Sequence, residues 1–253
     1  MFPSKLRICT AFGIPVYLDV SLIVLLVLFV MDFGSLTFGL ACALALAVSI
    51  TLHELGHALT ARAFGYGTRD ITLSLLGGCA SLTGMPRKAY QEFLTALAGP
   101  LVSFALAGAA WAVTRFLPIE NDWLWGVLAY MFWMNLILGG FNLLPGFPMD
   151  GGRIFRSVAR IFTTRVKATY VAMVVGRVFA VLLALRGLHS IVNRGPWGFI
   201  SILIAWMIWR EGWREYVMAV QEERWGSPWE YSARVSRPPY DDGDDDEVEV
   251  RRR

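Results

Sequence analysis

The chain has 253 residues, of which 56% are hydrophobic and 17% are charged, and its formal net charge is +3. This balance is far from that of a soluble globular domain and is typical of a protein embedded in a lipid bilayer. Acidic residues gather in the last stretch and basic residues mark alternate loops, so the charge does not indicate nucleic-acid binding. The scattered Cys9, Cys42 and Cys79 exclude a disulfide framework and a paired-cysteine metal site.

Apolar stretches long enough to cross a bilayer recur along the chain and predict an all-α polytopic membrane protein with about six transmembrane helices. Residues 1–15 precede them and are expected to form a short amphipathic lead-in. The first apolar run follows Lys5 and Arg7 in the manner of a signal peptide but is expected to be retained. In chain order, the predicted spans cover about residues 16–31, 36–64, 93–116, 123–144, 171–185 and 197–209.

The segment after the second predicted span has a different pattern. Residues 71–75 alternate apolar and polar side chains, and a return strand over 79–82 follows Gly77 and Gly78. The segment is too short and too rich in glycine to span a bilayer, so it predicts a small re-entrant β-hairpin after the second helix. An ordinary surface connector is the alternative.

The residues that carry chemistry begin in the second predicted span, where Thr51–Leu59 reads TLHELGHAL. His53 and His57 are four residues apart on a helix, so they share a face and can bind one metal ion. Glu54 is then placed to accept a proton from an attacking water molecule. The alternative is that the three groups only hydrogen-bond to neighbouring helices, but burying them in an apolar segment is costly unless something coordinates them.

A second motif, NLLPGFPMDGGR, covers Asn142–Arg153. Pro145 and Pro148 each remove a backbone donor, so a helix must unwind there and can turn a carboxylate inward. A catalytic zinc site takes three protein ligands, and two histidines with one acid are a known set, which makes Asp150 the candidate third ligand. The alternative for Asp150 is an N-cap of a helix over residues 153–162.

Together these motifs resemble those of the site-2 proteases, a family of intramembrane zinc metalloproteases. The resemblance covers about residues 50–156 and also includes Gly77–Gly78 and the sequence LAGP at 97–100. It implies one Zn²⁺ per chain, and the compact layout resembles the prokaryotic branch, here without PDZ or CBS domains. By this resemblance His53, His57 and Asp150 bind zinc, Glu54 is the catalytic base, and Asn142, Gly77 and Gly78 position the substrate.

The expected function is regulated intramembrane proteolysis, in which peptide bonds within or near transmembrane segments of membrane proteins are hydrolysed. An exposed strand edge within residues 71–82 is expected to hold the unwound substrate by strand addition. The main alternative is a metal-binding transporter or sensor without proteolytic activity, against which Glu54 argues because transport does not need it. A membrane scaffold that recruits partners through its acidic tail is a third alternative.

The loop charges predict a multi-pass protein of the plasma membrane with both termini in the cytoplasm. Residues 1–215 are expected to form the transmembrane metalloprotease domain, and residues 216–253 a cytoplasmic segment whose acidic tail is disordered from about residue 237. The expected partners are a transmembrane protein substrate and the lipid bilayer, with a homo-oligomeric or regulatory membrane partner left open. A solvated cytoplasmic face is expected for Arg153, Arg156, Arg160, Arg165 and Lys167.

Overall fold

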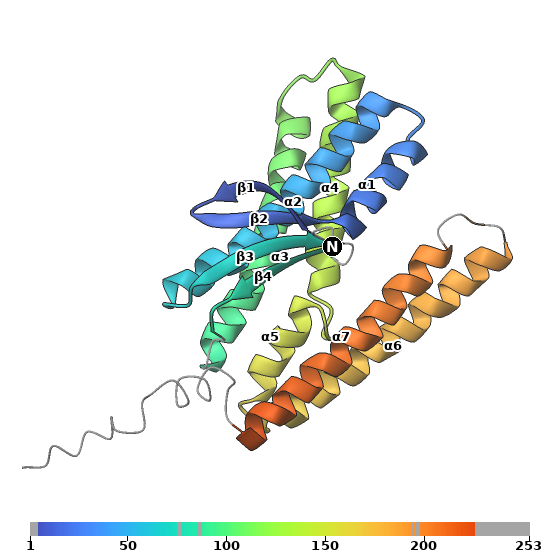
Figure 1. The fold of residues 1–253 in the computed structure, drawn as a ribbon. Helices are drawn as coiled ribbons and strands as arrows, with labels where there is room; N and C mark the ends of the chain where they lie inside the picture. Colours follow the sequence, from blue (N-terminus) through green and yellow to red (C-terminus); the bar gives the residue numbers. More distant parts are fainter. Residues whose placement is uncertain (1–4, 75–76, 85–87, 194, 196–197, 226–253) are drawn as a thin grey trace, which may run out of the picture.

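The structure is a computed structural model and describes residues 5–74, 77–84, 88–193, 195 and 198–225. Most of these residues are helical, and one small sheet lies across the helices (Figure 1). The strands are β1 (Lys5–Ala11), β2 (Ile14–Asp19), β3 (Thr68–Ser74) and β4 (Gly77–Leu82). The helices are α1 (Val20–Asp32), α2 (Leu36–Ala63), α3 (Ala89–Phe116), α4 (Asp122–Asn142), α5 (Asp150–Ala159), α6 (Arg165–Val192) and α7 (Gly198–Trp225).

The four strands form one mixed sheet in the order β1-β2-β3-β4. A tight turn joins β1 to β2, and its residues Phe12 and Gly13 have φ angles of 51° and 79°, the positive values that a type I′ hairpin needs. β2 pairs in parallel with β3, which pairs in antiparallel fashion with β4. The predicted hairpin after the second helix is confirmed. The mostly helical class is confirmed, but the sheet has two more strands than the predicted hairpin, because the expected amphipathic lead-in forms β1 and the start of β2.

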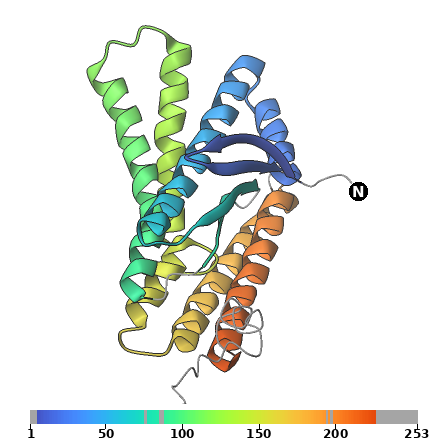
Figure 2. The same cartoon turned by 60° about the vertical axis from the view of Figure 1, so that its left-hand side comes forward.

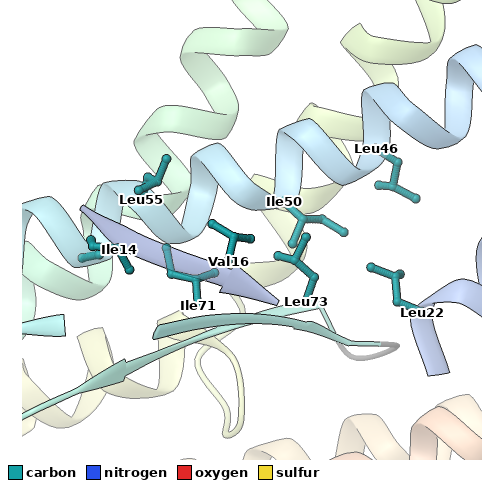
Figure 3. Packing of buried hydrophobic residues seen from close by; sticks show 9 residues of the cluster. Ile14, Val16, Leu22, Leu46, Ile50, Leu55, Ile71 and Leu73 are labelled. Carbon is teal, nitrogen blue, oxygen red and sulfur yellow. The ribbon is translucent and has the colours of Figure 1, made fainter. Parts of the chain in front are cut away.

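Apolar side chains on one face of the sheet pack against α2 and fix the position of the sheet. Ile14 and Val16 of β2 and Ile71 and Leu73 of β3 are fully buried, and alternate residues of a strand point to the same face. They form one cluster with Leu22, Leu46, Ile50, Leu55 and Ala58 (Figure 3). As a result, the edge strand β4 is held in contact with α2.

Four helices are long and apolar enough to cross a bilayer, namely α2, α3, α4 and α6, and each coincides with a predicted span. The first predicted span instead begins in β2 and continues into α1, whose 13 residues rise only about 20 Å. The sixth predicted span is the first part of α7, a longer helix with a charged second half. A count of six spans is therefore not confirmed by the described residues. The predicted acidic tail lies outside them.

The helices form two groups that α5 connects. Figures 1 and 2 show α6 and α7 side by side as a pair, set apart from α1–α4, and α5 contacts α3 on one side and α6 on the other. The chain leaves α4 after Asn142 and starts α5 at Asp150, which confirms the predicted unwinding at the two prolines. The backbone N–H of Phe147 donates to the carbonyl of Ala172 at 3.2 Å, so this loop is docked on α6.

Candidate metal centre

Three predicted ligands converge at one point where α2 meets the start of α5. The Nε2 atoms of His53 and His57 are 3.2 Å apart. Asp150 Oδ2 lies 3.2 Å from His53 Nε2 and 3.1 Å from His57 Nε2. All three residues are buried, with exposed fractions of 2%, 7% and 8%. The structure thus brings together residues that lie 93 and 97 positions apart in the chain.

Hydrogen bonds behind the histidines orient both rings. His57 Nδ1 lies 2.7 Å from the carbonyl oxygen of Thr95, which can only accept, so Nδ1 carries the hydrogen and neutral His57 has its lone pair on Nε2. His53 Nδ1 lies 2.9 Å from the hydroxyl of Ser103. Such partners of the second ring nitrogen are typical of histidines that bind a metal.

The donor set fits a metal ion. Four-coordinate zinc has bonds of about 2.0–2.2 Å to histidine and carboxylate, which corresponds to ligand–ligand separations of about 3.3 Å. The observed separations of 3.1–3.2 Å are close to this value. In this buried site, a lone pair of His57 lies close to the second imidazole and to a carboxylate. This arrangement is unfavourable without a cation between the three groups. Among the described residues, this is the group that could hold a metal.

Helix α3 packs behind the two histidine rings, and the residues that contact the rings are spaced four apart. Thr95 and Ser103 make the hydrogen bonds to the two rings, and Gly99 lies between them on the same face. A Cβ atom on Gly99 would overlap the Nε2 atoms of both histidines. The residues at 97–100 stand out in the sequence, but the roles of Thr95 and Ser103 were not predicted from it. Gly99 and Ser103, four residues apart in an apolar helix, were a signal, whereas Thr95 acts through its backbone carbonyl and its residue type gave none.

Glu54 lies between the metal ligands and the edge of the sheet. It is buried at 7% exposure, and its Oε2 accepts a hydrogen bond of 3.1 Å from the backbone N–H of Ala80 in β4. A Cβ atom on Gly78 would overlap the Glu54 side chain, so this strand approaches α2 closely only because residue 78 is glycine. The backbone contact to Glu54 was not predicted from the sequence.

The other predicted site residues have different surroundings. Gly77 pairs with Ser74 at the start of β4. Asn142 ends α4, and its side-chain amide donates to the carbonyl of Leu138 in the same helix at 3.0 Å. Asn135 lies two helical turns before Asn142 on the same face of α4. It is fully buried, and its side-chain amide donates to the hydroxyl of Ser49 of α2 at 2.9 Å. Asn135 therefore links two helices, while the structure shows no direct contact of Asn142 with the three ligands.

Comparison with known proteins places the chain in a family. The model of peptidase family M50 matches residues 41–119 and 118–185. A zinc metalloprotease of Methanocaldococcus jannaschii, MJ0392, is 35% identical over 188 residues, which are 74% of this chain and 55% of that protein. The protein sll0528 of Synechocystis sp. is 36% identical over 222 residues, which are 81% of this chain and 58% of that protein.

A solved structure is also similar, that of a site-2 protease from Methanocaldococcus jannaschii. It has a TM-score of 0.64 and 32% identity, and the match covers 84% of this chain and 95% of that chain. The fold is thus that of a solved site-2 protease. The chain belongs to peptidase family M50. It spans somewhat more than half the length of the two curated relatives.

Proposed function

We propose that this chain is an intramembrane zinc metalloprotease that hydrolyses peptide bonds within or near transmembrane segments of other membrane proteins. The observation that carries the proposal is the convergence of His53, His57 and Asp150 beside Glu54, on a helix long and apolar enough to cross a bilayer. The name of the relative MJ0392 supports zinc as the metal, and the one such ligand group found among the described residues supports one ion per chain.

The residues of the site divide the chemistry between them. His53, His57 and Asp150 hold the zinc, which when bound polarises the scissile carbonyl and makes water a better nucleophile near neutral pH. Glu54 takes a proton from the attacking water and returns it to the leaving amine. Ala80 holds the Glu54 carboxylate through its backbone N–H, and Thr95 and Ser103 hold the two imidazole rings.

The free edge of β4 is the proposed binding surface for the substrate backbone. A transmembrane helix hides its carbonyls in its own hydrogen bonds, so it must unwind before cleavage. β4 is an edge strand, and the N–H of Ala80 points away from β3 toward Glu54. An unwound peptide added to this edge would lie beside Glu54. Gly77 and Gly78 position the substrate here, and Asn142 also positions it.

The membrane arrangement is part of the same proposal. Six spans result if α1 and the first part of α7 join the four long apolar helices, with both termini in the cytoplasm and the protein in the plasma membrane. Residues 1–215 then form the protease domain, and residues 216–253 a cytoplasmic segment. The partner is a membrane protein with a transmembrane segment, and a homo-oligomeric or regulatory membrane partner is compatible with this arrangement.

The test uses purified protein in lipid vesicles with a single-span substrate, comparing wild type with Glu54→Gln. We expect wild type to cut the substrate and hold about one zinc per chain, and Glu54→Gln to keep the zinc while losing cleavage. Mass spectrometry of the fragments locates the cut. Equal activity of Glu54→Gln and wild type in every assay would contradict the proposal, and would be the result expected of a transporter or sensor with the same ligands.

A further inference from the structure

Helix α5, which begins with the metal ligand Asp150, carries an arginine that is buried among charges. Arg156 is only 2% exposed. Its Nε donates to Glu92 of α3 at 2.7 Å, and its Nη1 donates to Glu215 of α7 at 3.3 Å. The expectation of a solvated basic face is therefore wrong for Arg156, because carboxylates from two other helices surround it.

Arg153 extends this charged group toward the metal centre. It follows Asp150 by three residues on the same face of α5, and its Nη2 lies 3.5 Å from Glu215 Oε1. Glu92 also pairs with Arg160 at 3.3 Å. Glu215 of α7 thus pairs with both Arg153 and Arg156 of α5. These arginines lie about one and two helical turns after Asp150.

Burial makes the Arg156–Glu215 pair sensitive to the loss of a partner, because the two side chains are 2% and 13% exposed, whereas Arg153 is 41% exposed. Burial by itself raises the pKa of Glu215, but Arg153 and Arg156 outweigh it and hold the pKa below its ordinary value, so Glu215 is an anion at neutral pH. Removing one partner of a buried pair leaves an uncompensated charge, which is far more costly than losing an exposed pair. Without Glu215, Arg153 would have Asp150 as its neighbouring anion and Arg156 would keep only Glu92. Helix α5 would lose both of these ion pairs to α7.

We infer that Glu215 is a positioning residue for the metal centre, which holds α5 through Arg153 and Arg156 so that the carboxylate of Asp150 meets the two histidines. The C-terminal helix pair α6–α7 thereby sets the metal affinity of a site to which it contributes no ligand. The inference rests on the proposed role of Asp150 as a ligand. It assigns a role in the metal centre to Glu215, a residue outside the motifs found in the sequence.

The experiment measures zinc affinity by competition with a chromogenic chelator, using the full chain in detergent. Glu215→Gln should weaken zinc binding by about tenfold or more, the size expected for a residue that orients a ligand from outside the coordination shell. The matched control is Glu211→Gln, one turn away on α7, where Glu211 forms an exposed pair with Arg214 at 3.0 Å. It should stay within about twofold of wild type, because such pairs contribute little.

A double-mutant cycle separates positioning from a general loss of structure. If Glu215 acts through Asp150, then Glu215→Gln should change zinc affinity less than about twofold in an Asp150→Ala background. The inference would be overturned if Glu215→Gln lowered zinc affinity equally in the wild-type and Asp150→Ala backgrounds. It would also be overturned if Glu215→Gln bound zinc like wild type while Asp150→Ala bound it more weakly. If Asp150→Ala itself binds zinc like wild type, the proposed ligand set is wrong and the inference falls with it. Should Glu215→Gln not fold, Glu215→Asp replaces it in the same cycle and must show the same dependence on Asp150.

Discussion

The backbone N–H of Ala80 donates a 3.1 Å hydrogen bond to the carboxylate of Glu54, although the two residues belong to the sheet and to a membrane helix. The bond exists because the apolar face of β2 and β3 is packed on α2 and so brings β4 next to the histidine motif. The sheet therefore orients the proposed base, and changes in β4 should affect catalysis without affecting the metal.

Replacing Ala80 by proline removes this N–H and tests the role directly. The N–H points to the free edge of the sheet, where proline is tolerated, so pairing with β3 should persist. Losing a hydrogen bond to a charged group should lower cleavage by about tenfold to a hundredfold. Zinc content should not change. Ala80→Ser keeps the N–H and should behave like wild type, and equal cleavage by Ala80→Pro and Ala80→Ser would show that the bond is not needed.

A side chain at residue 78 should displace Glu54. A Cβ atom there overlaps the Glu54 side chain, and moving a catalytic group by about 1 Å can cost about a hundredfold in rate. We therefore expect Gly78→Val to cleave about a hundredfold more slowly while it still binds zinc. Cys79→Val is the matched control, because the exposed Cys79 is adjacent in the strand and points to the other face. A similar loss in both variants would indicate damage to β4 itself.

Gly99→Ala should act on the metal rather than on the base. The added methyl group would overlap the Nε2 atoms of His53 and His57, so zinc affinity should fall by about a hundredfold or more. Gly108→Ala in the same helix is the control, since a Cβ atom there meets nothing within 4 Å. Chelator competition measures both variants, and unchanged affinity in Gly99→Ala would mean that the histidines adopt another arrangement when zinc is bound.

Removing the metal should destabilise the protein. A ligand present at about a hundred times its dissociation constant stabilises the folded state by about 2.7 kcal/mol, which corresponds to about 5–10 °C in Tm for a chain of this size. Chelator treatment of wild type should lower Tm by this amount, and added zinc should restore it. Asp150→Ala should show a much smaller shift, because one of its ligands is missing. An equal shift in both proteins would place the zinc elsewhere.

The sequence predicted the residues that meet in the candidate metal centre better than it predicted the sheet. His53, Glu54 and His57 follow from spacing on one helix, and Asp150 from the two prolines that must unwind the chain before it. The strand β1 was missed because its residues are mostly exposed and show no buried face. β2 pairs with β3, some fifty residues further along the chain, so its state is set by tertiary packing rather than by local pattern.

The charged residues of α5 and α7 show a second limit of prediction. A cluster of arginines usually marks a solvated surface, and nothing local indicates that Arg156 will be buried. Its partners Glu92 and Glu215 lie 64 and 59 positions away in the chain. Their meeting depends on how α3, α5 and α7 are arranged, which periodicity and spacing do not specify.

The most direct test of the account is the zinc coordination of purified wild type, measured by X-ray absorption, beside zinc content and cleavage by Asp150→Ala. We predict a first shell of two imidazole nitrogens and carboxylate oxygen in wild type, with bonds of about 2.0–2.2 Å. We also predict weakened zinc binding and lost cleavage in Asp150→Ala. A shell that contains sulfur, or one unchanged in Asp150→Ala, would contradict the assignment of His53, His57 and Asp150 as the metal ligands.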